Sequence, residues 1–117
     1  MVRLFIYGGS NTLTPDSYVK QISNILSKLA INYEIINRGL GTTTTIIGAI
    51  KLLDDISIMK DDDIIIHEYY INDQNQSIVG LIEWDTVLHN LETFIKIANG
   101  RKVISILIKT ILDFKNE

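Results

Sequence analysis

The stretch that decides the fold is "VRLFIYGGSNTLTP", residues 2–15. It begins with six mostly apolar residues, 2–7, which are typical of a buried strand, and a pair of glycines ends the run. Thr14 and Pro15 then predict the start of a helix, with threonine as the N-cap and proline at the first helical position. A buried strand that turns sharply into a helix is the first half of a β-α-β unit, and Ser10 lies in that turn.

The same order of strand and helix continues along the chain. Further strands are predicted at 32–37, 63–69 and 102–108, and apolar residues recur at helical spacing between them. The first predicted helix has Tyr18, Ile22, Ile25, Leu26 and Leu29 on one face. The second has Ile46, Ile50 and Leu53, with Ile47 and Ile56 beside them. The third has Trp84, Val87, Leu88, Leu91, Phe94, Ile95 and Ala98. Between Tyr69 and Glu83 the chain is polar, and we predict irregular structure there.

The β-α-β-α-β-α-β order predicts a parallel sheet with helices on both faces. The strands are apolar almost throughout, which fits burial on both sides. We therefore predict a three-layer α/β fold with strand order 2-1-3-4, which right-handed crossovers allow. We expect residues 1–117 to form a single domain.

Composition and charge exclude several classes of function. The net charge of −3 provides no basic surface for nucleic acid, and the absence of cysteine excludes disulfides and thiolate metal sites. With only two histidines we expect no metal site, and no feature points to a cofactor. The apolar runs are far shorter than the roughly 20 residues of a membrane helix. No signal peptide is recognisable, so we expect a cytoplasmic protein without membrane contact.

Three predicted loops leave the carboxyl ends of strands, where parallel sheets bind ligands. They are residues 8–14, 38–44 and 69–83. With strand order 2-1-3-4 all three converge on one crevice. The first loop carries Ser10, the second Gly39 and Gly41, and the third Asn72 and Asp73. A serine in a tight turn exposes its hydroxyl, a glycine lets a backbone N–H approach closely, and an asparagine amide adds a further donor. Donors around a serine oxygen suit acyl transfer, in which losing one typically costs about 100- to 1000-fold in rate.

Three motifs extend this interpretation to a family. "YGGSNT", "NRGLGTTTT" and "HEYYINDQN" resemble, in order and spacing, the first three sequence blocks of the SGNH (GDSL-like) hydrolases. The resemblance implies a flavodoxin-like α/β fold and an esterase, lipase or enzyme that transfers or removes acyl groups on carbohydrates. It also implies that Ser10 is the nucleophile and that Gly41 and Asn72 are the oxyanion donors. The substrate would be a small-molecule ester or an acylated carbohydrate.

The sequence departs from the family pattern at several positions. Gly9 stands where the family has aspartate, and Tyr70 where the third block has glycine. The fourth block, Asp-x-x-His after a fifth strand, is absent, although it would supply the base that a serine nucleophile requires. We therefore expect a domain that is incomplete at its C-terminus and has little or no esterase activity by itself.

Other residues are weak substitutes for the missing base. His67 falls inside the third strand and is predicted to be hydrogen-bonded in the core, and His89 falls off the apolar face of its helix. Asp73 could act as a base, but an Asx turn that stabilises its own loop is the preferred interpretation. Glu68 lies near the end of the same strand.

Two other functions stay open. A glycine-rich turn before a helix also suits a phosphate-bearing ligand, so a flavodoxin-like binding module without catalysis is the alternative. A non-catalytic relative that binds a protein partner is another. The predicted fourth strand, "VISILI", would be an apolar edge, and such edges invite pairing with another chain. We therefore expect either that further sequence covers this edge or that the chain self-associates through it.

Overall fold

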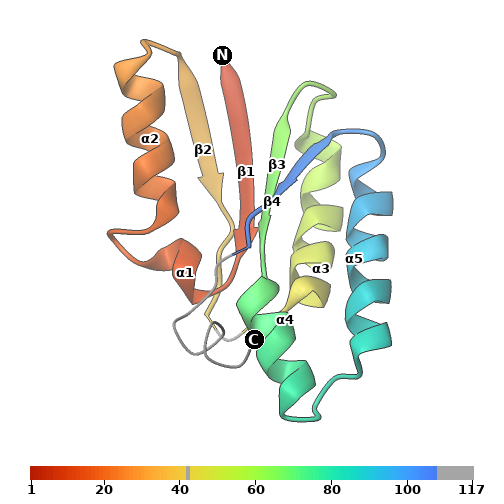
Figure 1. Ribbon diagram of the computed structural model, residues 1–117. Helices are drawn as coiled ribbons and strands as arrows, with labels where there is room; N and C mark the ends of the chain where they lie inside the picture. The colour runs from red at the N-terminus through yellow and green to blue at the C-terminus, as the bar shows by residue number, and fades with distance from the viewer. Residues whose placement is uncertain (42, 108–117) are drawn as a thin grey trace.

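The computed structural model describes residues 1–41 and 43–107, and Figure 1 shows their arrangement. The strands are β1 (Val2–Gly8), β2 (Tyr33–Asn37), β3 (Ile64–Glu68) and β4 (Lys102–Ser105). The α-helices are α1 (Ser10–Leu13), α2 (Tyr18–Lys28), α3 (Thr45–Asp55), α4 (Tyr70–Ile78) and α5 (Trp84–Ala98), and a 3₁₀ turn, η1 (Ile56–Ile58), follows α3. None of the helices in these ranges is long and apolar enough to cross a membrane.

The four strands form one parallel sheet in the order β2-β1-β3-β4, as predicted. Leu4 on β1 pairs with Ile35 on one side and with Ile64 on the other. β1 therefore lies inside the sheet, and five consecutive residues of it, 4–8, are buried. Its carboxyl end meets the loops that follow both of its neighbours.

Helices cover both faces of the sheet, so the predicted three layers are confirmed. Figure 1 shows α3 and α5 packed side by side on one face and α2 on the other. The core under α3 and α5 contains Phe5, Tyr7, Ala49, Leu52, Ile65, Tyr69, Phe94 and Ala98. The core under α2 contains Leu4, Ile6 and Ile66, with Ile22 and Leu26 of the helix packed against them.

The predicted apolar face of the second helix is wrong. Ile46, Ile50 and Leu53 are exposed, and α3 instead buries Thr45, Gly48, Ala49 and Leu52. A side chain at Gly48 would collide with the ring of Tyr69, so this helix approaches the sheet through its smallest residues. The close approach of the α3 backbone to Tyr69 explains the orientation of the helix, in which the larger apolar side chains are exposed to solvent.

Two boundaries also differ from the prediction. The first long helix begins at Tyr18, and its N-cap is Ser17, whose Oγ accepts a hydrogen bond from the N–H of Val19. Thr14 and Pro15 instead join α1 to α2. The segment predicted to be irregular contains α4, which places Asn72 and Asp73 on a helix.

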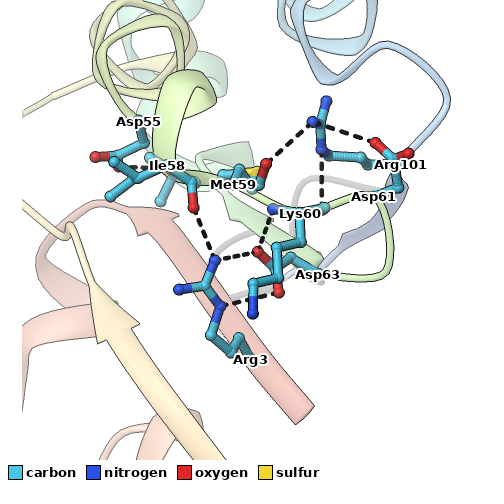
Figure 2. A network of polar contacts seen from close by, with 9 residues as sticks. Arg3, Asp55, Ile58, Met59, Lys60, Asp61, Asp63 and Arg101 are labelled. Carbon is cyan, nitrogen blue, oxygen red and sulfur yellow. Dashed lines mark hydrogen bonds and ion pairs between the residues drawn. The ribbon is translucent and has the colours of Figure 1, made fainter. Parts of the chain in front are cut away.

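The amino ends of the strands are held by two arginines, far from the crevice. Arg3 of β1 donates to both carboxylate oxygens of Asp63 and to the carbonyl of Ile58 (Figure 2). Arg101, just before β4, donates to the carbonyls of Met59 and Lys60. These bonds attach β1 and β4 to the turn that precedes β3.

β4 is shorter than predicted. It ends at Ser105, whereas the predicted strand ran over 102–108, and residue 108 lies outside the described part of the chain. Among the described residues β4 pairs with β3 alone. Ile104 is 51% exposed and Leu107 is 66% exposed.

Candidate active site

The candidate site begins with the turn at Gly8 and Gly9. Gly8 ends β1 and Ser10 begins α1, so the chain passes from strand to helix across one residue. A side chain at Gly8 would overlap the Oγ1 of Thr12, which explains why the turn has no larger residue there. Ser10 is exposed at the start of the single-turn helix. The predicted loop 8–14 is thus partly helical, but it presents the serine as expected.

The turn is hydrogen-bonded to the segments that follow both neighbouring strands. The N–H of Leu40, in the loop after β2, donates to the carbonyl of Gly8 at 3.0 Å. The N–H of Gly9 donates to the carbonyl of Glu68, the last residue of β3, at 3.2 Å. Three segments that are distant in sequence are therefore joined at the carboxyl end of β1.

Asn72 projects from α4 toward this point. Its Nδ2 donates to the carbonyl of Thr43 at 2.5 Å, which ties α4 to the loop after β2. The same amide also lies against Gly9, because a β-carbon at position 9 would overlap Asn72 Nδ2. The structure thus brings Asn72 beside the residue that precedes Ser10.

Gly41 lies in the same loop, between Leu40 and Thr43, and is partly exposed. A β-carbon on Gly41 would meet no heavy atom of the described residues within 4 Å. Within that part of the chain the space on this side of the backbone is open, so a ligand could occupy it. No described residue requires glycine at position 41 for steric reasons. The absence of a side chain there would matter only for a ligand that approaches the backbone from solvent.

Asp73 does not form the predicted Asx turn. Its Oδ1 accepts a 2.9 Å hydrogen bond from the N–H of Thr45, and its Oδ2 accepts one from the Thr45 hydroxyl. Asp73 is buried, and burial raises the pKa of its carboxyl above the ordinary value, against the opposing effect of the Thr45 bonds. The contact joins α4 to the first turn of α3, so Asp73 has a structural partner far away in sequence.

His67 is buried in the core, as predicted, and is not placed to serve Ser10. Its Nε2 lies 2.9 Å from the hydroxyl of Thr45 and its Nδ1 lies 3.0 Å from the hydroxyl of Ser105. Burial lowers the pKa of the imidazole to about 4. His89 is exposed on α5, as expected. Across residues 1–41 and 43–107, neither histidine hydrogen-bonds to Ser10.

A buried polar cluster under the serine turn was missed in the sequence. Glu68 is 1% exposed and accepts a 3.2 Å hydrogen bond from the Thr12 hydroxyl. Thr12 also lies 2.6 Å from the hydroxyl of Tyr18 on α2. Burial raises the pKa of the Glu68 carboxyl. The available signal was a glutamate that directly follows an apolar strand, since such a side chain needs a polar partner when buried.

A hollow near the site lies beside these residues and not over them. It has a volume of about 370 Å³ and is lined by the α1–α2 connection, α2 and β2, including Leu13, Pro15 and Ile35. Ser10, Gly41 and Asn72 are not among its lining residues.

Comparisons with solved structures show which known fold this chain has. The structure of TesA matches with a TM-score of 0.73 and 18% sequence identity, over 96% of this chain and 63% of that one. AlinE4, described as an SGNH-hydrolase family esterase, matches with a TM-score of 0.70 and 17% identity, over 97% and 62% of the two chains. This chain has the SGNH-hydrolase fold. The acetyl xylan esterase AlAXEase shares this fold with a TM-score of 0.67 and 17% identity, over 89% and 57% of the two chains.

The comparison with the SGNH-hydrolase fold covers part of each neighbour. The chain spans between 61% and 63% of the length of TesA and two AlinE4 structures. No sequence profile of a protein family matches the chain, and no curated protein does. The likeness is thus one of fold, and the roles of individual residues have to be argued from their geometry.

Proposed function

We propose that this chain carries the nucleophile and the oxyanion donors of an SGNH-type ester hydrolase or acyltransferase. The observation that carries the proposal is that the Ser10 turn, the Gly41 loop and Asn72 meet at the carboxyl ends of the inner strands. The SGNH-hydrolase fold of the chain and the esterases that share it support the same chemistry.

The proposed residues have separate roles. Ser10 Oγ would attack the acyl carbon of an ester, and the ester C–O bond would break as the acyl-enzyme forms. The Asn72 amide and the N–H of Gly41 would stabilise the negative oxygen of the intermediate. The serine proton needs a base, and neither histidine of the described residues contacts Ser10. We therefore expect little or no esterase turnover through Ser10 from these 117 residues alone.

The substrate class we propose is a small ester, including an acyl group on a carbohydrate. One protein with this fold is an acetyl xylan esterase, which supports acyl groups on sugars as candidates. The open space at Gly41 supports a substrate that reaches the serine from solvent. Water or a second hydroxyl that attacks the acyl-enzyme would decide between hydrolysis and transfer.

We further propose that the chain self-associates through the edge of β4. Among the described residues this strand has a partner on one side only, and it exposes Ile104. An exposed apolar edge strand is a template for pairing with another chain. A second copy of β4 would form hydrogen bonds with the unpaired backbone groups of this strand and would bury the side chain of Ile104.

The test of the nucleophile is phosphonylation of Ser10, mapped by mass spectrometry of peptides. A fluorophosphonate should modify Ser10 slowly, and added imidazole should accelerate the reaction because it supplies the base from solution. Asn72→Ala should lower this rate by about 100-fold through loss of an oxyanion donor. Asn75→Ala, which changes an exposed asparagine on the same helix, is the matched control and should leave the rate unchanged.

Two results would overturn the proposal. One is the absence of modification at Ser10 even at high imidazole concentration, while the protein remains folded. The other is equal modification of Ser10 and of the exposed Ser57, because a surface serine without donors should not react.

A further inference from the structure

A second serine lies beside a histidine at a different place on the sheet. Ser105 is the last residue of β4, and it pairs across the ladder with His67 of β3. The two side chains consequently share one face of the sheet, and Ser105 Oγ lies 3.0 Å from His67 Nδ1. Ser105 is exposed, whereas His67 is only 4% exposed. A reagent in solution can therefore reach the serine while the histidine stays protected.

The other nitrogen of His67 continues into a buried chain of hydrogen bonds. His67 Nε2 lies 2.9 Å from the hydroxyl of Thr45, and the same hydroxyl donates to Asp73 Oδ2. A hydroxyl has one proton, so with that proton on the bond to Asp73 the hydroxyl must accept from His67 Nε2–H. This network assigns the imidazole proton to Nε2 and leaves the lone pair of Nδ1 directed at Ser105.

Packing fixes the ring in this orientation. The ring of His67 makes edge contacts with Tyr69 at 5.3 Å and with Phe94 of α5 at 5.0 Å between centroids. Asp73 is held in turn by the N–H of Thr45 at 2.9 Å. The lone pair of Nδ1 is thus presented to the serine hydroxyl by a rigid set of contacts, which is the geometry that an activated serine requires.

We propose that Ser105 is a second nucleophile of this protein, with His67 as its general base and Thr45 and Asp73 as positioning residues. In the proposed step, Ser105 Oγ forms a bond to the acyl carbon of an activated ester while the bond to the leaving oxygen breaks. The serine proton passes to His67 Nδ1 and then to the leaving oxygen. The positive imidazole of the intermediate is stabilised through Thr45 by the Asp73 carboxylate. This site shares no nucleophile with the one at Ser10.

The first experiment maps phosphonylation in the intact chain. A fluorophosphonate should form an Oγ–P bond at Ser105 with loss of fluoride, and the modification should persist in Ser10→Ala and disappear in Ser105→Ala. Thr45→Val should lower the rate at Ser105 by about 100-fold, because the base loses its orientation, and Thr45→Ser should restore it. A merely structural role of Thr45 would change stability without this difference between valine and serine.

The second experiment uses the absence of cysteine in the sequence. Ser105→Cys then has a single thiol, and Ser57→Cys is the matched control at another exposed serine. Iodoacetamide should alkylate Cys at position 105 about tenfold faster than at position 57, because the Nδ1 lone pair of His67 can accept the thiol proton. His67→Gln in the Ser105→Cys background should remove the advantage.

The outcomes separate this site from the one at Ser10. Modification at Ser105 alone supports the present proposal and counts against Ser10 as a nucleophile, and modification at Ser10 alone does the reverse. Equal alkylation at positions 105 and 57, or a rate at Ser105 that Thr45→Val leaves unchanged in folded protein, would overturn the role of His67. The thiol comparison decides the question even if His67→Gln fails to fold.

Discussion

The amide of Asn72 occupies the space beside Gly9 at the serine turn. The Asn72 amide lies where a β-carbon of residue 9 would be, and it donates to the carbonyl of Thr43 at 2.5 Å. The departure of position 9 from the aspartate of the SGNH pattern has a physical consequence here. The missing side chain is what lets the asparagine pack against the serine turn.

Gly9→Ala should therefore destabilise the protein through Asn72. We expect a loss of about 1 kcal/mol in the free energy of unfolding, since the new methyl group forces the amide away from Thr43. Urea unfolding followed by circular dichroism measures this. Gly41→Ala is the matched control and should change stability by less than about 0.5 kcal/mol, because its methyl group meets no neighbour.

A double variant identifies the cause. In an Asn72→Ala background the space beside residue 9 is empty, so adding Gly9→Ala should cost nothing further. If Gly9→Ala costs the same with and without the Asn72 side chain, the proposed collision is wrong.

At the scale of elements, the order of strands and helices was predictable and the orientation of the helices was less so. An apolar run that ends at two glycines identified β1, a near-continuous apolar run identified β3, and the alternation with helices identified the parallel sheet. The face of α3 was misjudged because the periodicity of Ile46, Ile50 and Leu53 says nothing about how closely a backbone must approach. Gly48 and the ring of Tyr69 determine that, and they meet only in three dimensions.

At the candidate site, too, contacts between residues that are distant in sequence could not be predicted. Ser10 and Asn72 could be singled out because they follow strands, and the fold brings their segments together. The pairing of Ser105 with His67 could not be predicted, since it depends on the register of β3 against β4. A serine within the otherwise apolar "VISILI" was the single available signal.

The ion pair at the amino ends of the strands predicts an acid-dependent contribution to stability. Hydrogen bonds from Arg3 hold the pKa of Asp63 below its ordinary value of 3.8. A carboxyl whose pKa is lowered by folding stabilises the native state above its unfolded pKa, and this stabilisation is lost as the pH falls through the folded pKa. Asp63→Asn should consequently lower the urea midpoint at pH 7, and the difference from the parent should shrink below pH 3.8.

The control for this prediction is another ion pair with exposed partners. Asp16→Asn removes the partner of Lys20, and these side chains are 92% and 56% exposed. It should leave the urea midpoint nearly unchanged at both pH values. A constant difference between Asp63→Asn and the parent across the acid range would contradict the assigned role of the Arg3 contact.

At the scale of the whole molecule, the open edge of β4 is the feature with consequences in solution. Self-association through this edge predicts that the mass from light scattering exceeds 13.3 kDa and rises with protein concentration. Ile104→Lys should restore the monomer mass, because a charge on an edge strand opposes pairing. Ile25→Lys replaces a similarly exposed residue on α2 and should behave as the parent. A parent that keeps the monomer mass at every concentration would contradict the proposal.

The central place of β1 has a consequence for the order in which the chain folds. β1 is synthesised first, yet one of its two neighbours is β3, and the turn at Gly9 is closed by the carbonyl of Glu68. Residues up to Glu68 must therefore be synthesised before the serine turn can form its hydrogen bond to that residue. Such distant pairing slows folding because loop closure has to precede the contacts that stabilise it. Until β3 has been synthesised, the apolar strand β1 has no partner on the side where β3 will pair with it. β1 is therefore the segment that a chaperone would need to cover.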